Sequence, residues 1–245
     1  MAPYQIETAT ALGWPPQDEI NIAGWRVFTG LGPVGRVNSC WPLDFDGSDV
    51  EAAIKRVEVH YRTKNLLPQF KLIVDGAAPA DLLERLIHRG YQTVSHVAVM
   101  THTGSFFSPP QAVTVTQYVT KAFEAFVMEA SPTALDGRER VEILRRVPNP
   151  SAFGEIEFEG ELVAVGLAAF TGQSAGIASM RTKPEFRKRG YARSLLRAVA
   201  ARAYEAGAST LWLQVETDNI AARQLYLGEG FDVAYRYKTM QFGKI

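Results

Sequence analysis

A basic segment between residues 181 and 193 has the residue types that bind an anion. Its cations are Arg181, Lys183, Arg187, Lys188, Arg189 and Arg193. Gly190 precedes a stretch whose apolar spacing predicts a helix from Tyr191 to Ala206. Unpaired N–H groups at a helix start, with the positive end of the helix dipole, favour negative charge. A diphosphate would fit there, and a solvated basic turn is the alternative.

The next strand leads to a polar cap and a phenol. Leu211 to Glu216 has strand character, and Asn219 after it is a residue type that caps helices. Tyr226 lies two turns further along that helix, roughly 10 Å away on nearly the same face. The two polar side chains are therefore expected to share one stripe.

In combination, these segments resemble the GNAT superfamily of N-acetyltransferases. The coenzyme A signature Q/R-x-x-G-x-G/A is matched by Arg187, Gly190 and Ala192, with the permitted alanine at its last position. The later motif of strand, Asn-x-x-Ala, Leu-Tyr and Gly-Phe is matched by Val215, Asn219, Ala222, Leu225-Tyr226 and Gly230-Phe231. The resemblance covers roughly residues 112 to 245.

The resemblance implies acetyl-CoA as the cofactor. Two parallel strands would splay apart, and the pantetheine arm would pair with the backbone of Met180, Arg181 and Thr182. An N–H near Met180 would polarise the thioester carbonyl. The diphosphate would rest on the N–H groups of Lys188, Arg189, Gly190, Tyr191, Ala192 and Arg193. Arg187 and Arg189 would add charge, Ala222 belongs to the motif, and Asn219 either contacts the pantetheine arm or only caps its helix.

The same resemblance implies transfer of the acetyl group to a primary amine by direct attack. Tyr226 is the candidate general acid, because a phenol with a pKa near 10 stays protonated at neutral pH and can protonate a departing thiolate. A core tyrosine is the alternative. Glu216 is the candidate general base, with a solvent-facing strand end, or a base made of water and carbonyl groups, as alternatives.

The order of elements predicts an α/β (α+β) protein with two GNAT-like domains, each a mixed central sheet flanked by helices. Pro109-Pro110, in the run from Ser105 to Gln111, marks a linker between residues 1–108 and 109–245. The expected helices are 49–64, 80–89, 191–206 and 219–228, and the expected strands are 70–74, 94–101, 161–170, 176–182, 211–216 and 235–242. Aligning Gly90-Tyr91 with Gly230-Phe231 matches helix, turn and strand in both halves. Chance recurrence of a common unit is the alternative.

The first half is predicted to be a degenerate copy without cofactor binding. In that alignment Leu86 replaces Tyr226 and Pro79 replaces Asn219, and the segment from Cys40 to Asp49 has no cofactor motif. Its three acids would repel a diphosphate. We expect this half to wall the substrate cleft or to form an interface, which is the reason to expect a homodimer.

Two other motifs are interpreted as turns. Gly30, Gly32 and Gly35 spell G-x-G-x-x-G, but strand and turn residues follow where a dinucleotide site needs a helix. Gly172 to Gly176 spells the G-x-S-x-G of a hydrolase, but another strand follows, and every histidine lies in the first half.

Composition excludes several classes of protein. Lys plus Arg equals Asp plus Glu at 26 each, so there is no global field for nucleic acid. Cys40 alone rules out an intrachain disulfide and a thiolate zinc cluster, so no metal is expected. No leader or membrane span is visible, which predicts a cytoplasmic protein.

The function predicted on this basis is an acetyl-CoA-dependent N-acetyltransferase that acts on a small-molecule or peptide amine. A non-catalytic acyl-CoA-binding sensor or assembly module is the alternative. The segment from Glu129 to Arg140 is expected to be irregular and to shape the amine pocket.

Overall fold

The computed structural model describes residues 1–74, 76–106 and 108–243, so Phe107 of the predicted linker lies outside the described residues. The chain divides into two compact units. Unit 1 comprises residues 1–15, 99–215 and 219–234, and unit 2 comprises residues 16–98, 216–218 and 235–245. The boundary predicted at residue 108 differs from this division, because each unit takes segments from both halves of the sequence.

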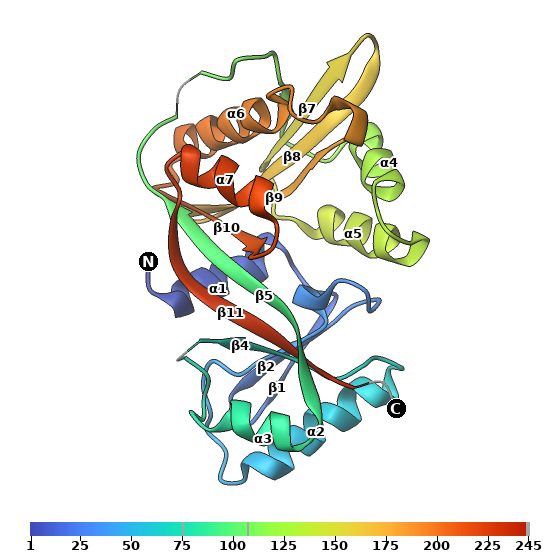
Figure 1. Ribbon diagram of the computed structural model, residues 1–245, viewed down its shortest axis with the longest axis vertical. Helices are drawn as coiled ribbons and strands as arrows, with labels where there is room; N and C mark the ends of the chain where they lie inside the picture. Colours follow the sequence, from blue (N-terminus) through green and yellow to red (C-terminus); the bar gives the residue numbers. More distant parts are fainter. Residues whose placement is uncertain (75, 107, 244–245) are drawn as a thin grey trace. The chain divides into compact units, whose positions relative to one another are not determined.

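Unit 1 contains most of the second half of the chain (Figure 1). Its elements are α1 (Pro3–Gly13), β6 (Thr114–Thr116), α4 (Lys121–Glu129), α5 (Ala134–Arg146), β7 (Ala152–Phe158), β8 (Glu161–Thr171), β9 (Ser174–Thr182), α6 (Tyr191–Glu205), β10 (Thr210–Glu216) and α7 (Ile220–Gly228). Unit 2 contains β1 (Asp18–Ile22), β2 (Trp25–Thr29), β3 (Cys40–Trp41), α2 (Val50–Thr63), β4 (Gln69–Ile73) and α3 (Leu82–His88). The strands β5 (Tyr91–His102) and β11 (Asp232–Phe242) contribute residues to both units, and Glu216, the last residue of β10, belongs to unit 2.

The long strand β11 explains why each unit contains segments from both halves of the sequence. Its residues from Tyr237 to Gln241 pair antiparallel with β4, from Ile73 back to Gln69. The last strand of the sequence is thus an inner strand of unit 2. The described strands form one mixed sheet in the order β1-β2-β3-β4-β11-β5-β10-β9-β8-β7-β6. A mixed α/β fold is confirmed, whereas two separate sheets were expected.

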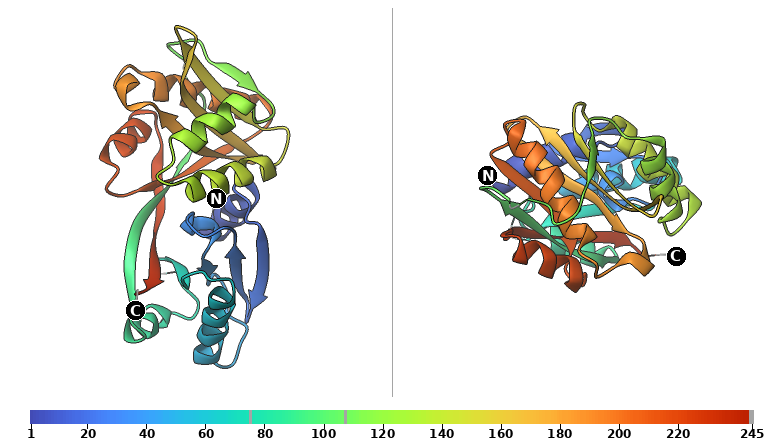
Figure 2. Two further views of the ribbon diagram at one scale, coloured as in Figure 1. Left: turned by 90° about the vertical axis from the view of Figure 1, so that its right-hand side faces the viewer. Right: turned by 90° about the horizontal axis from the view of Figure 1, so that it is seen from above.

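In unit 1, helices cover both faces of the strands β7 to β9 (Figures 1 and 2). Helix α6 packs on the face that carries Gly154 and Gly166, where Val199 and Leu195 of α6 occupy the space that a side chain at Gly154 would take. Helix α1 packs on the opposite face, where Gly13 lies against Ala169. Successive residues of a strand point to opposite faces of the sheet. The glycine contacts therefore place α6 and α1 in two layers, one on each face.

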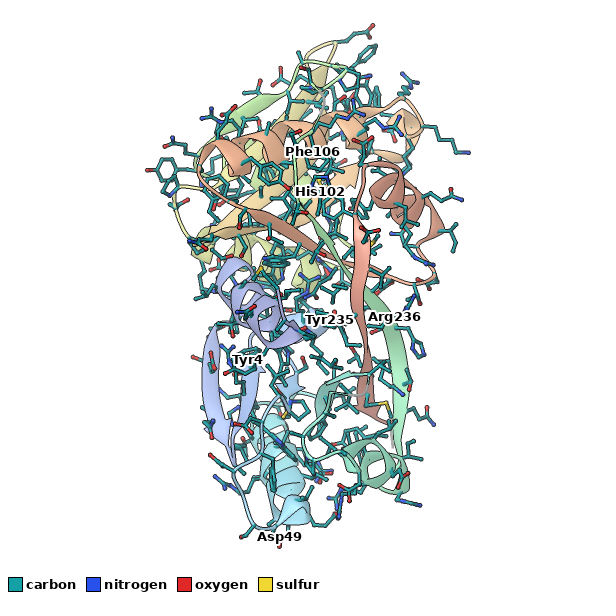
Figure 3. The ribbon with its side chains drawn as sticks, turned by 90° about the vertical axis from the view of Figure 1, so that its left-hand side faces the viewer. Tyr4, Asp49, His102, Phe106, Tyr235 and Arg236 are labelled. Atoms are coloured by element: carbon teal, nitrogen blue, oxygen red, sulfur yellow. The ribbon has the colours of Figure 1, made fainter. Side chains whose placement is uncertain are left out.

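Unit 2 has its own apolar core. Asp49 caps α2 by accepting a hydrogen bond from the Ala52 N–H at 3.0 Å (Figure 3). The helix buries Ile54 and Tyr61 against Trp25. No described helix is long and apolar enough to cross a bilayer.

The structure agrees with the turn interpretation of both short motifs. Gly30 to Gly35 connects the antiparallel strands β2 and β3, with one 3-10 turn from Gly35 to Val37. Gly172-Gln173 joins β8 to β9 in a hairpin in which Thr171 faces Ser174. Within the described chain, no α-helix begins directly after either motif, so neither segment has the helix that its site requires.

Candidate active site

The parallel strands β9 and β10 separate partway along their length. They pair from Ser174 and Thr210 to Ile177 and Leu213, the last pair recorded in the described chain, yet β9 continues to Thr182. The register of β8 with β9 shifts opposite Gly166, and Ser179 has a left-handed φ of 51°. A bulge of this kind bends a strand and increases its twist. The splayed strands expected from the sequence are thus present.

A cavity of about 1130 Å³ opens beside the separated strands. The α4–α5 connection, the end of β9, the basic loop and the starts of α6 and α7 line it. Predicted site residues that line the cavity are Met180, Arg181, Thr182, Arg187, Lys188, Gly190, Tyr191, Ala192, Arg193, Asn219, Ala222 and Tyr226. Arg189 and Glu216 are not among its lining residues in the described structure.

The backbone of the basic loop is shaped for an anion. Lys188 has a φ of 62° and Gly190 a φ of 86°, so left-handed residues alternate just before α6 begins at Tyr191. Within the described chain, no backbone carbonyl accepts a hydrogen bond from the N–H groups of residues 188 to 193. Successive unpaired N–H groups in such a turn form a concave anion site. These donors can therefore hold a diphosphate.

The basic side chains around this loop are not equivalent. Arg193 pairs with the buried Glu229 at 2.8 Å. Arg187 donates to the Thr182 carbonyl oxygen at 3.4 Å, and the Arg189 guanidinium lies 5.1 Å from the centre of the Phe186 ring. Arg197 pairs with the same carboxylate at 2.7 Å, so Glu229 compensates the charge of Arg193 only in part, and the exposed Lys188 adds further charge.

Gln111 is a site residue that the sequence did not reveal. Its Nε2 donates to the Arg189 carbonyl oxygen at 2.8 Å, and Ser194 Oγ donates to its Oε1 at 3.4 Å. In a trans peptide the carbonyl and the next N–H point in opposite directions. Holding the Arg189 carbonyl therefore also fixes the direction of the Gly190 N–H. No sequence pattern indicates this role, because Gln111 lies at the end of a run that contains two prolines and belongs to no motif.

Tyr226 lies in the cavity wall with only 7% of its surface exposed. Burial raises the pKa of its phenol to about 12, so the group keeps its proton at neutral pH. Its ring packs on Phe231, with ring centres 5.9 Å apart, and Phe231 in turn packs on His102 at 5.2 Å. Figure 3 shows His102 beside Phe106, whose ring centre lies 4.3 Å away. This aromatic group limits the orientations open to Tyr226.

Asn219 and Glu216 flank the turn that leads into α7. The Asn219 side chain accepts a hydrogen bond from the Ala222 N–H at 3.2 Å, so it caps the helix as well as lining the cavity. Its contact with the pantetheine arm stays a prediction. Glu216 is exposed at the end of β10, so the structure does not supply the burial that its role as a base assumed. That role also stays a prediction.

The segment expected to be irregular is mostly helical. Helix α5 begins at Ala134, where Thr133 accepts a hydrogen bond from the Asp136 N–H at 3.1 Å. Only residues 130–133 connect α4 to α5. The sequence did not predict this helix because Gly137 and the many charged residues of the segment obscure the helical spacing of its apolar residues. The short connection, including Ser131 and Pro132, does line the cavity.

A family model described as "Probable histone acetyltransferase Rv0428c C-terminal" matches residues 4–240. The chain belongs to this family, within the GNAT superfamily of N-acetyltransferases. The uncharacterized N-acetyltransferase YobR of Bacillus subtilis (strain 168) is 24% identical in an alignment of 243 positions that covers 93% of this chain and 93% of its own.

Two solved GNAT structures have a similar fold. A GCN5-related N-acetyltransferase from Kribbella flavida has a TM-score of 0.75 at 16% identity, covering 100% of this chain and 97% of its own. A tandem GNAT protein from the clavulanic acid biosynthesis pathway has a TM-score of 0.66 at 10% identity, covering 99% and 89%. At these identities the likeness shows the fold alone.

Proposed function

We propose that this GNAT protein transfers an acetyl group from acetyl-CoA to a primary amine within a ternary complex. The observation that carries the proposal is one cavity whose lining combines residues with unpaired N–H groups, Lys188 and 190–193, with Tyr226, whose phenol is protonated at neutral pH. The residues fit the coenzyme, because these donors suit a diphosphate and the strand edge at Met180 to Thr182 lies beside them.

Each residue has a defined task in this proposal. Bound acetyl-CoA supplies an acetyl thioester, and the backbone near Met180 stabilises negative charge on its carbonyl oxygen. The amine nitrogen bonds to the carbonyl carbon, the carbon–sulfur bond breaks, and Tyr226 donates its proton to the sulfur. The proton that the amine loses passes to water or to Glu216. The phenolate then recovers a proton from solvent.

Release of the coenzyme A thiol in the presence of primary amines tests the proposal. The panel includes small amines and lysine peptides, since the family's description names a histone as acceptor. We expect amine-dependent thiol release. Binding of acetyl-CoA with no release across the panel would instead support the acyl-CoA-binding module. We also propose a homodimer, and a monomeric mass by light scattering would contradict it.

A further inference from the structure

The guanidinium of Arg181 lies beside the α4–α5 connection, which belongs to the segment that the sequence predicts to shape the amine pocket; this part of the cavity is called the amine side below. Its Nη1 donates to the carbonyl oxygen of Ala130, in the α4–α5 connection, at 2.5 Å. Both residues line the cavity. The charged groups that act on Arg181 are Arg140 and Asp136, and both belong to α5. The strand therefore contributes a cation at the end of the cavity that the α4–α5 connection forms.

Arg181 has no carboxylate partner among the described residues. No acidic oxygen in the described chain lies within 4.0 Å of its guanidinium. Asp136, the acid that acts electrostatically on Arg181, is engaged by Arg140, whose Nε lies 2.5 Å and 3.1 Å from its two carboxylate oxygens. A half-buried guanidinium with one carbonyl acceptor keeps unused donors and an uncompensated charge.

The cation that directly follows β9, Lys183, is already paired. Lys183 Nζ lies 2.6 Å from Glu161 and 3.9 Å from Glu129. Glu129, the last residue of α4 and a lining residue of the cavity, has 73% of its side chain exposed to solvent. The unneutralised charge on the amine side is thus Arg181.

We propose that the acceptor carries a carboxylate besides its primary amine, and that Arg181 binds this carboxylate. The inference rests on the proposed function, since it assigns the substrate class of the same cavity. The planar guanidinium presents paired donors that match the two oxygens of a carboxylate. The carboxylate would supply the counter-charge that the protein does not.

The position of Arg181 also suits the chemistry of the amine. Burial, with a smaller effect from Arg140, lowers the pKa of Arg181 to about 10, so it stays charged at neutral pH. A nearby positive charge disfavours the ammonium form of a bound amine. The same side chain would therefore anchor the acceptor and favour the neutral nucleophile.

The test compares matched amines that differ in one group. Glycine, β-alanine and γ-aminobutyrate are compared with their carboxamides and with a lysine-rich histone peptide. Binding to protein saturated with coenzyme A is measured by calorimetry, alongside thiol release. We expect at least one carboxylate to bind about tenfold or more tightly than its amide, as for a hydrogen-bonded ion pair. High salt should reduce this ratio.

Variants then assign the preference to one side chain. Arg181→Gln should bring the carboxylate-to-amide ratio close to one, while Arg181→Lys should retain part of it. Arg138→Gln makes the same charge change at an exposed α5 position outside the cavity, so it should leave the ratio unaltered. The wild-type ratio remains informative even if the Arg181 variants misfold.

Three results would overturn the inference. The first is a wild-type protein that binds carboxylates no more tightly than their amides, and the second is a preference for the cationic peptide. The third is a carboxylate-to-amide affinity ratio that Arg181→Gln leaves unchanged while it weakens acetyl-CoA binding. The last result would assign Arg181 to the diphosphate. Failure of the proposed function is distinct, because it appears as absent thiol release whatever the calorimetry shows.

Discussion

At the residue scale, the wall of the cavity sets the chemistry of Tyr226. Burial raises its pKa to about 12, and Phe231 holds one side of its ring. A protonated phenol is the form that can donate to a departing thiolate. The hydroxyl is therefore the part of this side chain on which turnover should depend.

Replacing that hydroxyl should slow turnover without weakening coenzyme binding. For Tyr226→Phe we expect kcat to fall about 100-fold, in the range for loss of a general acid. The dissociation constant for acetyl-CoA, measured by calorimetry, should stay within about twofold, since a twofold change corresponds to well under 1 kcal/mol. Tyr118→Phe, at a 60% exposed tyrosine outside the cavity, is the matched control. An unchanged kcat in Tyr226→Phe would remove the assignment.

The pH dependence of kcat has a defined sign. Tyr226 acts in its protonated form, so its contribution is complete below its pKa and is lost as pH rises through about 12. We expect no decline of kcat between pH 7 and about pH 10 in stopped-flow measurements, because the unperturbed phenol value is already near 10. A decline of kcat that begins below pH 10 in the wild-type protein and is absent in Tyr226→Phe would contradict this prediction. It would show that the phenol of Tyr226 loses its proton below about pH 10.

The sequence predicted these residues because they occur in motifs of fixed spacing. Arg187, Gly190 and Ala192 are such a set, and all but Arg189 and Glu216 of the predicted residues line one cavity. Gln111 could not be predicted in the same way. Its role depends on contacts with Arg189 and Ser194, which lie about 80 positions away.

At the element scale, the turn into α6 depends on two left-handed residues. Gly190 has a φ of 86°, and an added Cβ would meet nothing closer than Gln111 Nε2 at 3.7 Å. Space is therefore available there, and the backbone conformation is what favours glycine. Helix α5 begins at Ala134 because Thr133 caps it, a signal that the prediction of an irregular segment did not use.

Gly190→Ala should separate backbone shape from stability. An alanine at this φ should lower the free energy of unfolding by about 1 kcal/mol. The substitution should also shift the N–H groups of the turn and so raise the KM for acetyl-CoA severalfold. Gly207→Ala is the control, because Gly207 has a φ of 94°, open space around it and a place at the far end of α6. Both variants should lose similar thermal stability, but only Gly190→Ala should change KM. Equal KM values would contradict the role of the turn.

At the scale of the whole molecule, the two compact units do not follow the sequence halves. Residues 1–15 belong to unit 1, where Ile6 of α1 is fully buried. Residues 235–245 belong to unit 2, where Met240 pairs opposite Phe70. The proline-rich run marks a linker in sequence, but it does not reveal strand pairing between distant segments. Such pairing is decided by tertiary contacts that local patterns do not contain.

This division predicts that the fragment 109–245 does not fold alone. It lacks α1 and the end of β5, both part of unit 1, and its last strand loses β4 as a partner. We expect no cooperative thermal transition by circular dichroism, whereas the full chain should show one. A folded fragment that binds acetyl-CoA would instead support the boundary expected at residue 108.

Backbone hydrogen exchange tests the central claim most directly. The claim is that the N–H groups of residues 188–193 hold the coenzyme diphosphate. Adding coenzyme A should slow exchange of these amides, because bonded donors exchange only when the bond opens. Gly207 and its neighbours should be unaffected. Unchanged exchange at 188–193, with protection elsewhere under saturating coenzyme, would contradict the account.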